Sequence, residues 1–283
     1  MFRRLLERFG SPQAAFEATQ TGAARTAGFP VPRPTVKRQP PELLDRALQW
    51  LDTIPDHHSL FWIGHPDYPP LLADIAEPPP VLFCRGTPSL LHQMPTLAVV
   101  GARQASPTGR AFARAIAGWA AQHGIAIVSG GARGIDAEAH QACLAQGGKT
   151  IAAIATGIDV VYPPEHASLF DDLARSGCLV TEFFPGTPPV ASHFPTRNRI
   201  IAGLAQAVIF IEGAARSGGL ITVQRALQAD RPVWAARHPD LLAGAQPGLE
   251  KRLASDRFFS APDEIFPLLQ KLFKPRRRRK SAS

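Results

Sequence analysis

Short apolar runs that alternate with helix-patterned segments constrain the fold of this chain more than any other feature of its sequence. The first clear pair is an apolar run at 97–100 followed by residues 107–123, where apolar side chains recur at helical spacing after Ser106 and Pro107. Further strands are expected at 125–128, 150–155, 178–182, 207–212 and 232–236, and further helices at about 164–175, 196–205 and 219–228. Continuously apolar strands separated by helices predict an α/β fold with a parallel sheet covered on both faces.

The sheet region is expected to be the main domain, spanning residues 56–273 and preceded by a small helical segment at residues 1–55. In the helical segment, helices are expected at 2–9, 12–19 and about 42–52. At the start of the main domain, a stretch with several proline pairs ends in an apolar run at 81–84. Because proline cannot donate to a sheet ladder, this run is expected to be an edge strand.

Residues 274–283 form a basic tail, which is expected to be disordered and to add non-specific affinity for nucleic acid. The tail's KPRRRRK run holds six of the chain's net charge of +8, so overall basicity says little about the folded surface. The three cysteines form no CxxC pair, which suits a reducing compartment. Neither a membrane-spanning apolar run nor a signal peptide is present, so a cytoplasmic protein without membrane attachment is expected.

Three glycine-bearing loops each follow an expected strand and open a helix. The first is VVGARQAS and the second SGGARGID. A third, RSGGLIT, either completes the same crevice or only caps its helix. The candidate binding residues in these loops are Gly101, Arg103, Gly130, Gly131, Arg133, Ser217 and Gly218. Glycines alone would be explained equally well by tight turns, but backbone N–H groups at helix starts together with arginines favour a phosphate site along one edge of the sheet.

The segment FPTRNR combines an aromatic ring, two guanidinium groups and an amide at the start of a helix. Its candidate residues are Phe194, Arg197, Asn198 and Arg199. Aromatic rings stack on bases and arginine forks hold phosphates, so this composition is typical of single-stranded nucleic-acid binding. The alternative is a core-packed phenylalanine beside a solvated basic face.

The sequence gives little support for catalysis. The histidines lack HExxH spacing, no G-x-S-x-G elbow occurs, and the glycine loops match neither GxGxxG nor GxxxxGK[ST]. Asp136, Glu138 and Glu182 are conceivable acid/base groups, although Asp136 is better explained as a charge at a helix N-terminus. No catalytic residue, metal or cofactor is therefore expected.

From residue 67 to residue 237, seven collinear blocks resemble the DprA (Smf) DNA-processing family of bacterial natural transformation. The blocks are DYPPLLADIAEPPPVLFCRG, VVGARQASPTG, IVSGGARGIDAEAH, DVVYPPEH, LVTEFFPGTPP, FPTRNRIIAGL and SGGLITVQRAL. The opening LLERFGSPQAAFEA is similar to part of that family's sterile-alpha-motif-like N-terminal domain. The resemblance implies an extended Rossmann-like domain that binds single-stranded DNA without sequence preference. It also implies a homodimer that protects incoming strands and loads RecA, and a protein that is not an enzyme.

The resemblance also assigns site residues. The family's GSRxxSxYG-type motif falls on Gly101, Arg103, Ser106 and Gly109, and its FxxRNR segment falls on the four FPTRNR candidates named above. The sequence departs from the family at Thr108, where an aromatic is usual, and after Ala236. A winged-helix-like domain is not expected after Phe273.

Two other classes of function stay open at this point. One is a nucleotide- or nucleoside-processing enzyme of phosphoribohydrolase type on a related fold. Its PGGxGTxxE motif, which would supply a catalytic glutamate, is not matched by SGGARGID or ARSGGLIT. The other is a structural partner protein.

Overall fold

The computed structural model describes residues 41–54 and 57–274, together with short stretches at 8–10, 14, 18 and 23–27. The helices expected at 2–9 and 12–19 lie largely outside these described residues, and the tail after Lys274 lies entirely outside them. Before residue 41, the described residues include one short helix, α3 (Ala23–Thr26).

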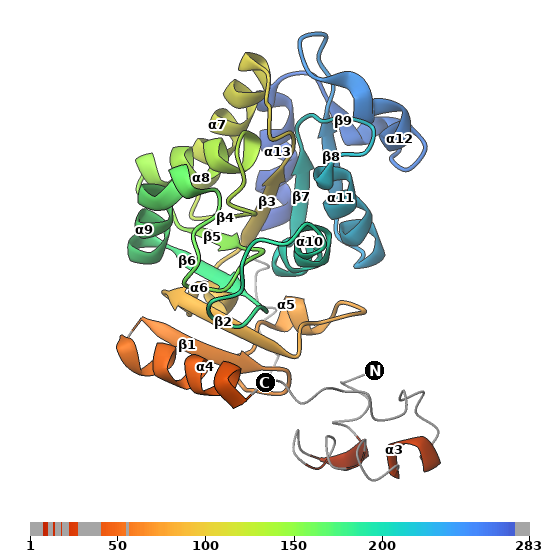
Figure 1. The fold of residues 1–283 in the computed structure, drawn as a ribbon. Coiled ribbons are helices and arrows are strands. Elements are labelled where there is room, and N and C mark those ends of the chain that lie inside the picture. Colours follow the sequence, from red (N-terminus) through yellow and green to blue (C-terminus); the bar gives the residue numbers. More distant parts are fainter. Residues whose placement is uncertain are drawn as a thin grey trace, which may run out of the picture.

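The described part of the chain is built on a nine-stranded sheet with the order β1-β2-β6-β5-β4-β3-β7-β8-β9 (Figure 1). The strands are β1 (His58–Trp62), β2 (Val81–Gly86), β3 (Thr96–Val100), β4 (Ala126–Ser129), β5 (Thr150–Ala153), β6 (Cys178–Thr181), β7 (Ala207–Phe210), β8 (Val233–Ala236) and β9 (Phe258–Phe259). All neighbouring pairs from β6 to β9 are parallel, whereas β2 is antiparallel to both β1 and β6. The predicted α/β fold with a parallel sheet is confirmed, and the antiparallel strands β1 and β2 extend that sheet on one side.

One expectation at the start of the sheet is wrong, and one strand there was not predicted. The strand expected at the edge, β2, lies between β1 and β6, so the edge assignment is wrong. The edge is formed by β1, whose sequence HSLFW was not predicted to be a strand. The proline pairs precede β2 and no proline lies within it, so its N–H groups are free to pair on both sides.

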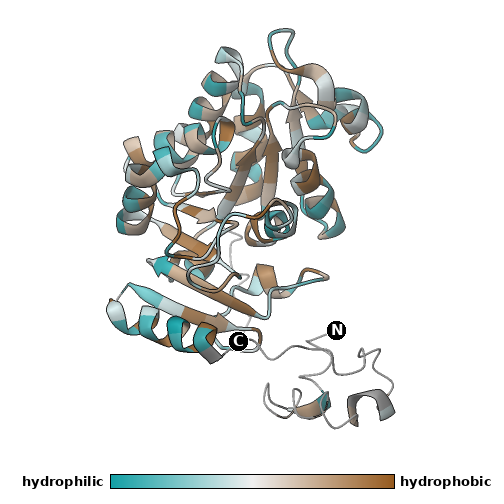
Figure 2. Cartoon of the chain, in the orientation of Figure 1, coloured by the Kyte–Doolittle hydropathy of each residue, from teal (hydrophilic) through white to brown (hydrophobic). Residues whose placement is uncertain are grey.

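Helices connect the strands and cover both faces of the sheet (Figures 1 and 2). They are α4 (Pro41–Thr53), α5 (Pro70–Ala73), α6 (Leu90–Gln93), α7 (Pro107–Gln122), α8 (Ile135–Ala145), α9 (Ala167–Ser176), α10 (His193–Leu204), α11 (Gly218–Gln228), α12 (Gln246–Glu250) and α13 (Pro262–Phe273). α7 begins as the sequence predicts, because the Ser106 hydroxyl accepts a hydrogen bond from the Gly109 N–H at 2.9 Å and Pro107 takes the first helical position.

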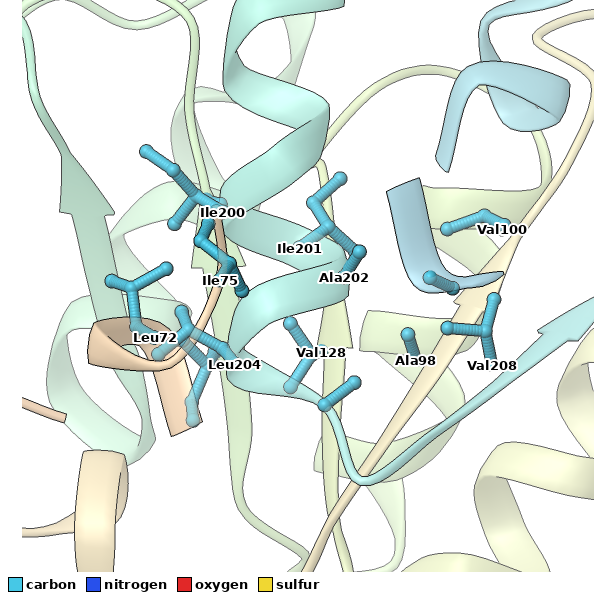
Figure 3. Close-up of a cluster of buried hydrophobic side chains, with 14 of the residues drawn as sticks. Leu72, Ile75, Ala98, Val100, Val128, Ile200, Ile201, Ala202, Leu204 and Val208 are labelled. Atoms are coloured by element: carbon cyan, nitrogen blue, oxygen red, sulfur yellow. The ribbon is translucent and has the colours of Figure 1, made fainter. Parts of the chain in front are cut away.

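Neighbouring strand residues point to opposite faces, and both faces are apolar. In β4, Ile127 packs in a cluster with α7, α8 and α13, whereas Val128 belongs to the cluster formed with α5, α10 and α11. Figure 3 shows the second cluster, in which Ile200, Ile201, Ala202 and Leu204 of α10 lie near Ala98, Val100, Val128 and Val208 of the strands. Burial on both faces explains why these strands read as continuous apolar runs.

α4 packs against the sheet rather than apart from it. Trp50 stacks on His58 of β1 with ring centroids 3.9 Å apart and meets Phe83 of β2 edge-on at 5.9 Å. Ala47 and Trp50 are buried in one cluster with Phe83 and α9. The division of the chain near residue 55 stays a prediction, and these contacts join α4 to the sheet on the other side of it.

The order of the strands reverses between β3 and β7. From β3 the chain proceeds through β4 and β5 to β6 in one direction, and β7, β8 and β9 extend the sheet in the other. In an open α/β sheet, connections on the two sides of such a point leave in opposite directions and open a crevice at the carboxyl ends of the strands.

Candidate functional site

A cleft of about 930 Å³ lies at this switch point. The loops that follow β3, β4 and β7 line it together with the first turns of α10 and α11. Eight of the thirteen predicted site residues line the cleft: Gly101, Arg103, Arg133, Phe194, Arg197, Asn198, Ser217 and Gly218. Gly130 lines a narrow recess that shares Arg103, Phe194 and Arg197 with the cleft.

An aromatic and a cationic group meet at the cleft. The Arg103 guanidinium carbon lies 4.9 Å from the centroid of the Phe194 ring, and Tyr162 approaches the same ring at 5.6 Å. Phe194 is half-buried and Arg103 is exposed. An exposed guanidinium over a partly exposed ring offers both a phosphate ligand and a stacking surface for a base.

Arg197 is a buried positive charge of the cleft. Its side chain donates from Nη1 to the carbonyl oxygens of Gly130, at 2.6 Å, and Ala153, and from Nε to Asn198 Oδ1 at 3.2 Å. Burial lowers the pKa of Arg197 to about 10, while the Asp136 carboxylate acts in the opposite direction. The guanidinium therefore remains charged at neutral pH, and its two carbonyl partners do not neutralise it.

Gly130 separates Arg197 from Asp136. A Cβ at Gly130 would lie 2.7 Å from Asp136 Oδ2 and 2.8 Å from Arg197 Cζ, so a larger residue here would displace these side chains. The Gly130 N–H donates to Asp136 Oδ2 at 3.1 Å. Burial raises the pKa of Asp136, against the lowering effects of Arg197 and of hydrogen bonds. Asp136 does lie in the first turn of α8, as predicted, but it also fixes the loop after β4.

The third glycine loop belongs to the same cleft. The Asn198 side-chain amide donates to the Gly218 carbonyl oxygen at 2.9 Å, which ties α10 to the start of α11. Ser217 occupies the N-cap position of α11, but its side chain makes no capping hydrogen bond. The choice left open by the sequence is thus resolved, since this loop lines the cleft and is not simply a side-chain cap.

Ser106 and Gly109 lie behind the first loop, where both face Glu212. The Ser106 N–H and hydroxyl donate to the two oxygens of Glu212 at 2.6 and 2.8 Å, and the Leu242 N–H donates to Oε2 at 2.8 Å. A Cβ at Gly109 would lie 2.2 Å from Glu212 Oε1. These residues shape the loop and do not line the cleft. The sequence prediction did not single out Glu212. The feature that could have identified it is an acidic residue at the end of an apolar run.

Arg199 is also directed away from the cleft. It forms a two-pronged ion pair with Glu182, in which Nη2 donates to Oε2 at 2.7 Å and Nη1 donates to Oε1. Its Nε donates to the Glu77 carbonyl oxygen at 2.8 Å. Every guanidinium nitrogen of Arg199 is thereby engaged within the protein.

The other predicted or conceivable groups have structural partners. Gly131 takes a left-handed φ of +65° beside the Phe170 ring. Arg133 is exposed and paired with Glu165. Glu138 accepts from Arg110 and Arg114 at 2.8 Å each. Tyr162 and Arg216 also line the cleft and were not among the predicted contacts, although Arg216 opens the third glycine loop, RSGGLIT.

Within residues 41–54, 57–274 and the shorter stretches before them, no group of three histidine, cysteine or acidic side chains could hold a metal ion. In the same part of the chain, no helix has the length and apolar character needed to cross a membrane.

The fold and cleft define a Rossmann-like α/β protein with an arginine- and aromatic-lined cleft at its switch point. The family model described as DNA recombination-mediator protein A matches residues 59–255, so the chain belongs to that family. The family resemblance read from the sequence is confirmed.

Individual relatives agree with this assignment. DNA processing protein DprA of Streptococcus pneumoniae is 45% identical over 169 residues, which cover 59% of this chain and 59% of that protein. The X-ray structure of DNA processing protein A from the same species superposes with a TM-score of 0.70 at 32% identity, covering 89% of this chain and 91% of that one. A structure of DNA processing protein A from Helicobacter pylori, concerned with its single-stranded DNA binding mode, superposes with a TM-score of 0.67 at 25% identity. The superposition covers 76% of this chain and 96% of that one.

Proposed function

We propose that this chain binds single-stranded DNA without sequence preference in the cleft between β3 and β7. The observation that carries the proposal is the arrangement of Arg103 over Phe194, beside the buried charge of Arg197. It combines a stacking surface, which every base can use, with cations for the phosphates. Support also comes from the Helicobacter pylori relative, whose single-stranded DNA binding mode has been described.

We further propose that the chain acts in DNA uptake during natural transformation, as a homodimer that protects incoming strands and loads RecA. This part rests on membership of the family and on relatives named DNA processing protein. The protein then works as a binding protein in the cytoplasm and not as an enzyme. Sedimentation tests the dimer, and RecA filament formation on coated single strands tests the loading step.

The binding proposal is tested by fluorescence anisotropy with a labelled single strand, the matching duplex and a mononucleotide. We expect the single strand to bind most tightly, with log affinity falling against log salt by about 0.7 for each neutralised phosphate. Flat salt dependence or a preference for duplex would contradict the proposal.

The rival nucleotide-processing enzyme makes a different prediction for the same cleft. Asp136 is the acidic residue among those that line it, and its raised pKa is of the kind that a general acid requires. Release of base or phosphate from a mononucleotide, abolished by Asp136→Asn, would replace the binding proposal by the enzymatic one. We expect no such release.

A further inference from the structure

A second groove, here called the outer groove, lies beside the cleft and is not explained by it. Its volume is about 590 Å³. The loop after β3 lines one part of it, and Glu138 and Gln141 of α8 line another, together with Arg110 of α7 and His166. Gln141 is exposed and lines only the outer groove.

The cleft and the outer groove share a wall. Four residues line both: Arg103, Gln104, Arg133 and Leu242. Arg103 and Arg133 are exposed, and they come from the loops after β3 and β4, respectively. A polyanion that crosses this wall therefore passes two guanidinium groups on its way from one groove to the other.

The charges of the outer groove favour an anion. Glu138 is its acidic residue, and two guanidinium groups, those of Arg110 and Arg114, contact this one carboxylate at 2.8 Å each. Two cations against one anion leave a positive surplus, to which Arg103 adds. Arg133 contributes less, because Glu165 offsets its charge.

Leu242 gives the wall an apolar component. Its side chain is 44% exposed, and its backbone N–H is held by Glu212 at 2.8 Å. A single exposed leucine is ordinary on a protein surface. Here it stands beside arginines on a fixed backbone between two grooves, where an apolar side chain can pack against the face of a base while the phosphates meet the guanidinium groups.

We propose that the outer groove is a second subsite for the same DNA strand, which leaves the cleft across the wall formed by Arg103, Gln104, Arg133 and Leu242. This inference rests on the proposed function and extends it, since it defines the path of the strand. It requires that a strand too short to cross the wall uses the cleft alone and that a longer strand uses both grooves.

The test compares two oligothymidylates, one of about 4 and one of about 16 nucleotides, which bracket common site sizes for single-strand binding. Gln141→Glu places a negative charge in the outer groove and should weaken binding of the long strand about fivefold, or about 1 kcal/mol, while leaving the short strand unchanged. Gln141→Lys should strengthen binding of the long strand and steepen its salt slope by about 0.7. Gln122→Glu is the matched control, because Gln122 is exposed on α7 and lines neither groove.

The outcomes separate the two levels of the proposal. Equal effects of Gln141→Glu on the two strands, or an effect no larger than that of Gln122→Glu, would overturn the proposal that the outer groove is a subsite. Binding of the short strand would still support the proposal that the cleft binds DNA. Failure of the unmodified protein to bind either strand would overturn both. Far-UV circular dichroism confirms that the variants are folded, as expected for an exposed helical position.

Discussion

The two sides of α10 use buried arginines in opposite ways. On the cleft side, Arg197 is 4% exposed and bonded to the carbonyl oxygens of Gly130 and Ala153. On the other side, Arg199 is 9% exposed and paired with the Glu182 carboxylate. Carbonyl groups hold the Arg197 guanidinium without cancelling its charge, and the Asp136 carboxylate lies beyond Gly130, whereas the Glu182 carboxylate pairs with Arg199 directly. The same residue type, two positions apart, thus lines the cleft in one place, where we propose that it binds DNA, and forms an internal ion pair in the other.

The largest effect expected to test this comparison is the loss of folding stability when Arg199 is replaced. Arg199→Met should lower the free energy of unfolding by about 3–5 kcal/mol, because it leaves the Glu182 carboxylate buried without its partner. Chemical denaturation measures this loss. The double variant Arg199→Met/Glu182→Leu, which removes both charges, should recover much of it. DNA affinity of the folded single variant should be unchanged, and a large loss of affinity would return Arg199 to the interface.

The same substitution on the cleft side should give a different pattern. Arg197→Met removes the donor from two carbonyl groups and should cost about 1–3 kcal/mol of stability. It should also weaken single-strand binding and reduce the salt slope by about 0.7, since a phosphate loses its cation. Parallel denaturation curves and salt titrations measure both effects. An unaltered salt slope would show that the charge of Arg197 serves the fold alone.

Stacking should contribute a smaller but cleanly separable effect. Phe194→Ala should cost about 1–3 kcal/mol of single-strand binding and little stability, because the ring is only half-buried. Phe258→Ala is the matched control: Phe258 is also half-buried, with the Arg237 guanidinium carbon 4.0 Å from its ring centroid, but it does not line the cleft. Equal affinities for the two variants in anisotropy titrations would argue against stacking at Phe194.

The smallest expected effect concerns the exposed charge. Arg103→Gln should reduce the salt slope by about 0.7 and weaken binding of all sequences alike, without a change in melting temperature. Arg237→Gln removes a comparable ring-covering arginine that follows β8 and does not line the cleft, and it should leave DNA binding unchanged. A loss that depends on base sequence would point to base recognition by Arg103.

The parts of the molecule that sequence reasoning recovered are those governed by local rules. Continuous apolar runs identified the parallel strands, and the rule that their carboxyl ends share one edge brought Arg103, Arg133 and Ser217 into a single cleft. Chain-order alternation alone cannot give pairing across the sheet. For that reason β1 was missed and β2 was assigned to the edge it does not occupy.

The rest depended on partners far away in the sequence. Nothing in FPTRNR distinguishes Arg197 from Arg199, because the distinction comes from Ala153 on one side and Glu182 on the other. Likewise, Ser106 and Gly109 fit a binding motif, while their role in the fold depends on Glu212, more than a hundred residues later. The sequence shows which polar side chains are present but not which of them form hydrogen bonds or ion pairs within the fold.

The buried carboxylate of Glu212 has a consequence for how this family can vary. It joins the loop after β3 through Ser106 and the segment after β8 through Leu242, and it occupies the space that a side chain at Gly109 would need. Positions 109 and 212 therefore form one steric unit. We expect a relative with a larger residue at position 109 to carry a shorter residue, or a displaced carboxylate, at position 212, and it then has to anchor both segments in another way. Covariation of positions 109 and 212 should accordingly identify the relatives in which the loop after β3 and the segment after β8 are held in a different way.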